Sequence, residues 1–244
     1  MMHNGEAKMK NAFLVGKKIY LRSPDLEKDV EEGEWHQWFN DAEITKYLMH
    51  GVYPNTKEKQ FQIIKNSIDR TDMLLMAIVD IEKDLLLGTV SLKSIDFINR
   101  TAEIAIVIGA TSYPKWAPLE AMALMTQHGF DRLNLNKIYA GQHVGLWKWV
   151  NRLELLGYKL EGYLRETHIR NGKACDSVRM GLLASEFYTL LKERDGKYIP
   201  DDFLAFLGKT RRNNVCMKIA EQIQKIYDDA NIPTTKENKE LDYV

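Results

Sequence analysis

Cysteine and histidine are the residue types here that most readily bind metals or act as nucleophiles, and their spacing argues against both roles. Cys175 and Cys216 lie far apart, with neither a metal-binding spacing nor a disulfide framework. We interpret them as inert or partly buried thiols in a reducing compartment. A helical pair of histidines with a nearby glutamate is a common zinc signature. No such pair occurs among His36, His50, His128, His143 and His168. We therefore expect no metal cofactor.

The first half of the chain reads as short strands interrupted by helices. Alternating or apolar runs predict strands over residues 18–22, 73–80, 85–95 and 102–108, the last three close enough for an antiparallel meander. Helical spacing predicts helices over residues 25–39, 42–48 and 57–69, and Thr56 is placed to cap the third.

The second half predicts a helix over residues 118–133, a strand over 137–140 and a helix over 146–156 ended by Gly157. A strand pair, 158–165 and 176–183, closes the pattern across a turn at residues 170–173. This order indicates a mixed α/β (α+β) fold and argues against a doubly wound parallel sheet.

The pattern changes after residue 184, which defines the expected domains. We interpret residues 1–11 as a loose leader, 12–184 as one α/β domain and 185–244 as a helical C-terminal extension with a polar tail. Helices are expected over 186–194 and 215–230. The second has an apolar stripe that we expect to pack either on its own domain or across a homodimer. The stripe consists of Val215, Ile219, Ile223, Ile226, Tyr227 and Ala230.

Charge and hydropathy narrow the class of partners. The 244 residues hold 34 Lys plus Arg and 34 Asp plus Glu, so no global charge attracts nucleic acid or an anionic membrane. No apolar run approaches the ~20 residues of a membrane helix, and the N-terminus does not resemble a signal peptide. These observations predict a cytoplasmic protein without nucleic-acid or membrane partners.

One segment carries a specific resemblance. Gly157-Tyr158 is followed by Glu161-Gly162, then by Leu164-Arg165-Glu166, a turn containing Gly172, and Asp176. This series resembles the closing signature of a branch of the GNAT superfamily of acyl-CoA-dependent N-acyltransferases. The branch contains the ribosomal-protein N-terminal and amino-sugar-nucleotide acetyltransferases. The resemblance spans residues 17–183 and implies a central mixed, mostly antiparallel sheet flanked by helices.

The resemblance implies acetyl-CoA as co-substrate, but the cofactor loop departs from the family pattern. Pro114 and Trp116 occupy glycine positions, although Pro118 remains acceptable at a helix start and Lys115 could supply a compensating cation. Leu146 and Trp149 replace the Asn and Ser of the second CoA signature. The implied cofactor contacts are Val107, Ile108, Tyr113, Lys115, Trp116, Ala117, Pro118 and Leu119.

In the family an amine attacks the thioester directly, so a base is needed to remove its proton. The resemblance places that base at Glu103, which could instead pair with Arg100 or Lys93. Trp35, Trp38 and Asn40 are candidates for the acceptor pocket, although a pair of tryptophans at helical spacing can also be core.

Two functions remain open at this stage. The first is an N-acetyltransferase acting on a primary amine, either an amino-sugar nucleotide or a protein N-terminus. The second is a GNAT-fold protein with a degenerate CoA loop that serves as a binding module or uses another acyl donor.

Overall fold

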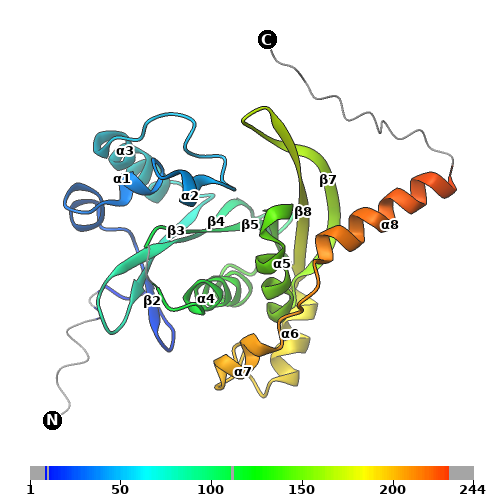
Figure 1. The fold of residues 1–244 in the computed structure, drawn as a ribbon. Coiled ribbons are helices and arrows are strands. Elements are labelled where there is room, and N and C mark those ends of the chain that lie inside the picture. The colour runs from blue at the N-terminus through cyan, green and yellow to red at the C-terminus, as the bar shows by residue number, and fades with distance from the viewer. Residues whose placement is uncertain (1–8, 10, 111–112, 231–244) are drawn as a thin grey trace.

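The computed structural model describes residues 9, 11–110 and 113–230, and the fold within this part is built on one sheet. Eight strands follow the order β1-β2-β3-β4-β5-β6-β8-β7 (Figure 1). All neighbouring strands are antiparallel except β5 and β6. The mixed, mostly antiparallel sheet predicted from the sequence is confirmed.

The elements have the following bounds. The strands are β1 (Leu14–Val15), β2 (Ile19–Arg22), β3 (Leu74–Asp80), β4 (Leu86–Asp96), β5 (Thr101–Ile108), β6 (Lys137–His143), β7 (Lys159–Arg170) and β8 (Lys173–Leu183). The α-helices are α1 (Trp35–Trp38), α2 (Ala42–Thr45), α3 (Lys57–Ile68), α4 (Ala117–Asp131), α5 (Trp147–Leu153), α6 (Ala184–Glu193), α7 (Phe203–Gly208) and α8 (Val215–Asp229). Shorter turns of π- or 3₁₀-helix are η2 (Leu26–Glu31), η3 (Val144–Leu146) and η4 (Glu154–Leu156).

The predicted helix over residues 25–39 was wrong, because the segment divides into η2 and α1. Gly33 lies at the division, where a Cβ atom would stand 2.3 Å from the carbonyl oxygen of Asp29. This close backbone approach requires glycine and prevents one continuous helix. The predicted cap of α3 is confirmed, since Thr56 Oγ1 accepts a hydrogen bond from the Lys59 backbone N–H at 3.2 Å.

Helices cover both faces of the sheet (Figure 1). On one face α4 packs against β2, β4, β5 and β6, and its buried side chains join the main apolar core. On the other face Val30, Trp35 and Ile64, from η2, α1 and α3, form a smaller cluster. The residues of β5 alternate accordingly: Ala102 and Ile104 point to the α4 core, whereas Glu103 faces the other layer.

Strands β7 and β8 form a long hairpin closed by a two-residue loop, with Arg170 paired to Lys173. Asn171 and Gly172 have φ angles of 51° and 71°. Positive φ at both loop positions is the geometry of a type I′ turn, which matches the twist of the strands and favours Asn-Gly. The sequence of this turn therefore fixes the pairing at the hairpin tip, and the register shifts at two irregularities further along the strands.

The C-terminal extension divides into a docked part and a projecting part. Phe187 of α6, Phe206 of α7 and Tyr198 between them are buried in the main core. The sequence did not predict α7. Helix α8 touches α5 and β7 near its start and then extends away from the sheet (Figure 1).

Two parts of the domain assignment fall outside the description. Most of the predicted leader, residues 1–8 and 10, and the polar tail, residues 231–244, lie outside the described residues. Within the described part, no helix is long and apolar enough to cross a membrane.

Candidate active site

The sheet opens between its two parallel strands. β5 and β6 pair only at Thr101–Lys137, Ala102–Ile138 and Glu103–Tyr139. Beyond this point β5 continues to Ile108 and β6 to His143, with no further pairing between them among the described residues. We call this divergence the fork. It leaves β5 peptide groups that face β6 without a strand partner, so they can bind a ligand.

Val107 and Ile108, the predicted backbone contacts, lie beyond the fork on β5. A free backbone N–H here could donate to the carbonyl oxygen of a thioester and stabilise the charge that develops on it. Such a contact would be made by the main chain, so side-chain identity does not reveal it.

Glu103 lies at the fork, on the face opposite α4. Its carboxylate forms an ion pair with Lys93 Nζ at 3.1 Å, and its side chain is 28% exposed. The other partner considered, Arg100, donates instead to the backbone carbonyl of Asn134 at 2.8 Å. The carboxylate is thus oriented by Lys93 while remaining open to solvent.

The predicted cofactor loop leads into α4, where Tyr113 and Lys115 are exposed. The backbone N–H of Ala117 donates to Pro114, those of Leu119 and Glu120 both donate to Trp116, and Pro118 has none. From Ala117 to Glu120 the helix start therefore offers no free N–H to an anion. Lys115 is exposed just before this helix start.

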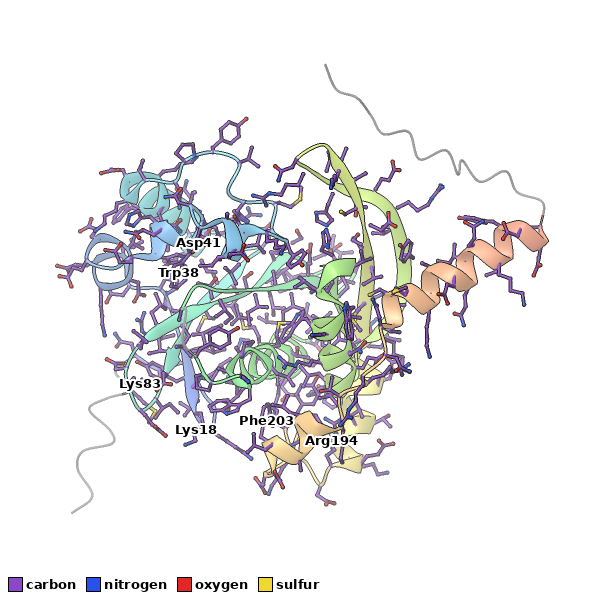
Figure 2. All side chains as sticks on the ribbon, viewed as in Figure 1. Lys18, Trp38, Asp41, Lys83, Arg194 and Phe203 are labelled. Atoms are coloured by element: carbon purple, nitrogen blue, oxygen red, sulfur yellow. The ribbon has the colours of Figure 1, made fainter. Side chains whose placement is uncertain are left out.

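Trp116 points toward the C-terminal extension. Its ring meets Phe203 of α7 edge-on, with centroids 6.2 Å apart. Figure 2 places Phe203 on the side of the sheet opposite Trp38 and Asp41. Ala117, Pro118 and Leu119 are buried, so their side chains anchor the loop rather than face a ligand.

The three residues predicted for the acceptor pocket have different surroundings. Trp35 is 1% exposed within its apolar cluster, so it supports the pocket wall. Trp38 lies directly over Gly109, where a Cβ atom would stand 1.8 Å from its ring. The Asn40 amide both donates to and accepts from the backbone of Asn55 at 2.8 Å, which fixes the start of α3.

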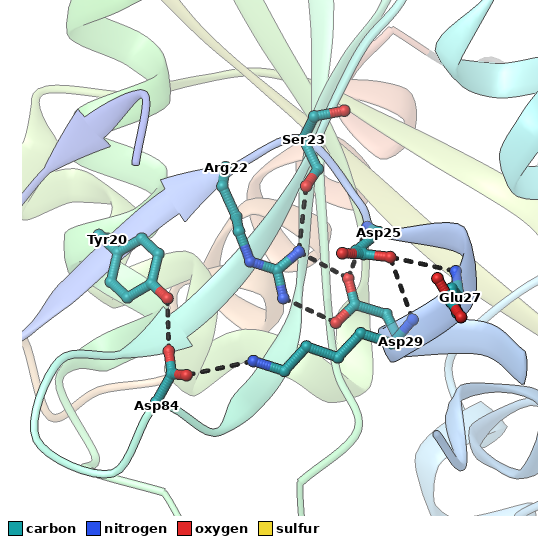
Figure 3. A network of polar contacts seen from close by, with 8 residues as sticks. Tyr20, Arg22, Ser23, Asp25, Glu27, Asp29 and Asp84 are labelled. Atoms are coloured by element: carbon teal, nitrogen blue, oxygen red, sulfur yellow. Dashed lines mark hydrogen bonds and ion pairs between the residues drawn. The ribbon is translucent and has the colours of Figure 1, made fainter. Parts of the chain in front are cut away.

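A cavity of about 1010 Å³ extends from Trp38 and Gly109 toward η2. Four carboxylates line it, and two of them are paired with cations of the wall (Figure 3). Arg22 makes a bidentate pair with Asp29 at 2.7 Å, and Asp84 binds Lys28 at 3.1 Å and the hydroxyl of Tyr20 at 2.6 Å. Burial and the neighbouring Asp84 raise the pKa of Tyr20 to about 12.

Sequence reasoning missed a second group of residues, at the end of β6. The ring of His143 lies 4.9 Å from that of Tyr47 and 5.2 Å from that of His168. The histidines have no metal-binding spacing in the sequence, which does not show that His143 and His168 lie together. Within the described residues, no three or more His, Cys, Asp or Glu side chains are grouped to hold a metal.

Comparisons with known proteins identify the family. A model of the family described as "Acetyltransferase (GNAT) domain" matches residues 18–157. The chain is 28% identical over 178 residues to "Uncharacterized N-acetyltransferase p20" of Bacillus licheniformis, covering 71% of this chain and 97% of that protein. It is 30% identical over 152 residues to the spermidine N(1)-acetyltransferase of Vibrio cholerae, covering 62% of this chain and 87% of that protein.

A solved structure shows the same fold. The spermidine N-acetyltransferase from Vibrio cholerae, crystallised in complex with CoA and spermine, superposes with a TM-score of 0.64 and 26% identity. The superposition covers 71% of this chain and 99% of that one.

Proposed function

Since the chain belongs to the GNAT acetyltransferase family and is therefore an N-acetyltransferase, we propose that it transfers acetyl from acetyl-CoA to a primary amine of a small molecule. The observation that carries the proposal is the fork, which exposes β5 peptide groups beyond Glu103. A relative of the same fold is solved with CoA, which supports acetyl-CoA as the donor.

The chemistry needs few groups. Acetyl-CoA supplies an activated thioester. The backbone of Val107 or Ile108 holds the carbonyl oxygen, and the acceptor nitrogen forms the new C–N bond as the C–S bond breaks. Glu103 receives one proton of the ammonium, directly or through a water. The second proton leaves the nitrogen to solvent as the amide forms, and the departing thiolate is protonated from solvent. Holding both substrates in register supplies much of the rate enhancement.

The acceptor is the least constrained part of the proposal. The named relatives act on spermidine, which favours a polyamine over the amino-sugar nucleotide or protein N-terminus expected from the sequence. Two carboxylates of the large cavity are paired with Arg22 and Lys28. The other two in its lining, Glu34 and Asp41, form no ion pair within the described residues, so the cavity keeps a negative charge that attracts a polycation. Spermidine is thus the reference acceptor, to be compared with amines of other charge.

The donor can be tested without knowing the acceptor. Calorimetric titration with acetyl-CoA and with CoA should give saturable heat, and each should raise the melting temperature. A Lys115→Ala variant should bind at least about tenfold more weakly, because a charge-assisted contact contributes roughly 1.5–3 kcal/mol. No heat and no thermal shift with the unmodified protein would refute acetyl-CoA use and favour the binding-module alternative.

Glu103 can be separated from its ion pair by two variants. Glu103→Gln should lower kcat by about 10²–10⁴-fold, the usual contribution of a general base, without changing CoA affinity. Lys93→Gln is the matched control, because it removes the ion pair of Glu103 but keeps the carboxylate. Equal losses of kcat in both variants, measured by thiol release, would assign Glu103 a structural role.

A further inference from the structure

A small pocket of about 130 Å³ lies between the segment that follows α2 and the tip of the β7–β8 hairpin. One wall is formed by residues 46–49 with Val52. The opposite wall contains His143 from the end of β6 and residues of the hairpin. The pocket volume fits a group the size of a phosphate or carboxylate, not a whole nucleotide.

All the charged side chains that line this pocket are positive. Lys46, Arg170 and Lys173 line it, and its lining contains no Asp or Glu. None of the three cations forms an ion pair with a carboxylate elsewhere in the described part of the chain. Three uncompensated cations around one cavity repel one another, and an anion would relieve that repulsion.

Arg170 is held rigidly in this arrangement. Its guanidinium donates to the backbone carbonyls of Thr45, Leu48 and His50, the last two at 3.0 and 3.3 Å. These bonds join the hairpin to the segment after α2 and fix the pocket shape. Carbonyl groups satisfy the donors but leave the positive charge of Arg170 without a counter-ion.

His143 adds a neutral donor. Its Nδ1 accepts the backbone N–H of Gly145 at 2.9 Å, so the proton of the neutral ring is on Nε2. Burial, aided by the neighbouring His168, lowers the pKa of His143, which keeps the ring neutral at pH 7. The nearby carboxylate of Asp176 is already occupied by the hydroxyl of Tyr163 and the backbone N–H of Glu166.

The pocket is placed beside the transfer site. Glu103 of β5 and Tyr139 of β6 are partners at the fork. Val107 lies four residues beyond Glu103 on β5, and His143 lies four residues beyond Tyr139 on β6. In each strand an even separation keeps the side chain on the face of the fork residue. His143 therefore lies on the same face of the sheet as Glu103, across the gap from the expected thioester.

We propose that this pocket binds a phosphate or carboxylate group of the acceptor, so that the enzyme selects amines that also carry an anion. The inference rests on the proposed function. Spermidine has no such group, and the pocket would distinguish this chain from relatives named for spermidine. Lys46, Lys173 and Arg170 would supply the charge, with His143 donating through Nε2–H.

The decisive experiment compares a matched pair of acceptors. Glucosamine 6-phosphate should have a kcat/KM at least about tenfold above that of glucosamine and above that of spermidine. The double variant Lys46→Gln/Lys173→Gln should abolish the preference for the phosphate, while glucosamine turnover stays unchanged. Lys65→Gln, an exposed lysine of α3 outside the pocket, is the control and should keep the preference. Equal kcat/KM for the two sugars in the unmodified protein would overturn the proposal.

Binding of inorganic phosphate tests the anion pocket independently of the proposed function. It should inhibit competitively against the amine and not against acetyl-CoA, and it should shift the imidazole NMR signals of His143 and His168. If no amine is acetylated but those signals shift, the proposed function fails and the anion pocket stands. Activation by phosphate, or inhibition that is not competitive with the amine, would show a separate effector site and would refute an acceptor-borne anion.

Discussion

The two halves of the C-terminal extension behave differently. The first half, α6 and α7, places Phe187 and Phe206 in the main core, and Phe187 stacks on Phe130 of α4 with centroids 4.9 Å apart. The second half, α8, buries only Cys216, while Met217 and Ile226 are each 60% exposed.

The difference shows where the folding unit ends. The family match stops at residue 157 and the sequence predicted a domain boundary at residue 184, yet buried side chains continue through Phe206 to Cys216 at the start of α8. The hydroxyl of Tyr198 donates to the Leu156 carbonyl at 2.6 Å, and Arg194 donates to Leu155 at 2.8 Å. We therefore propose that α6 and α7 belong to the domain and that α8 is an appendage.

Two truncations should give the largest effect. Deletion of residues 184–244 should abolish cooperative unfolding, because it removes Phe187, Tyr198 and Phe206 from the core. Deletion of residues 218–244 should retain a cooperative transition, because it removes no buried side chain of the described residues and keeps the carbonyls of Arg211 and Asn213 that bind the buried Asn151 amide. Thermal melts followed by circular dichroism compare the two chains. If the chain that lacks residues 184–244 also unfolded cooperatively, the proposal that α6 and α7 belong to the folding unit would be contradicted.

Point substitutions should show the same contrast on a smaller scale. Phe187→Ala should lower the free energy of unfolding by about 3–5 kcal/mol, as for other fully buried aromatic side chains. Ile226→Ala in α8, where the side chain is 60% exposed, should change it by no more than about 0.5 kcal/mol, the range for surface positions. Urea denaturation measures both. A large loss for Ile226→Ala would mean that α8 is packed in solution, for example against a second copy.

The contact of α7 with the cofactor loop should appear in catalysis. Phe203→Ala removes the edge-on partner of Trp116, and such aromatic pairs contribute about 0.5–1.5 kcal/mol. We expect KM for acetyl-CoA to rise about two- to tenfold with KM for the amine unchanged. Leu204→Ala, at a neighbouring residue that is 72% exposed, is the control. An equal rise in both Michaelis constants would show a general loss of structure.

The smallest effect concerns the joint between the sheet and the extension. The Lys17 backbone N–H donates to the buried carboxylate of Glu120, and Lys17 Nζ binds Asp201 at 2.9 Å. Burial raises the pKa of Glu120 despite the backbone donors. The folded protein therefore holds this proton more tightly than the unfolded chain. The contribution of Glu120 to stability falls as pH rises from its ordinary pKa through the raised folded value.

Glu120→Gln removes this titration. Its free energy of unfolding, relative to the unmodified protein, should improve as the pH rises above about 4.3, the ordinary pKa of a glutamate. Urea denaturation at several pH values measures the difference. A difference that does not change with pH would contradict the raised pKa.

Much of the fold followed from local pattern. Alternation predicted β2 to β5, and Gly157, which has a φ of 87°, ended its helical segment as expected. The break at Gly33 was missed because it depends on contact with the Asp29 carbonyl. Helix α7 was missed because only six residues form it, too few to show a helical period.

The site was predictable only in part. The resemblance indicated Glu103 and the β5 backbone, because motif residues mark those positions. The pocket that contains His143 and His168 was not foreseen, since the two residues meet only through the strand order β6-β8-β7. The contact between Trp116 and Phe203 likewise joins segments that sequence periodicity treats separately.

The fork also leaves a mark on amide hydrogen exchange. Along residues 104–108 of β5, one side of the strand bonds to β4 while the side facing β6 has no strand partner. Alternate amides of a strand point to opposite sides, so slow and fast exchange should alternate from one residue to the next in the free protein. A ligand lying in the gap would slow only the fast set, and the amides would record where along β5 it is bound.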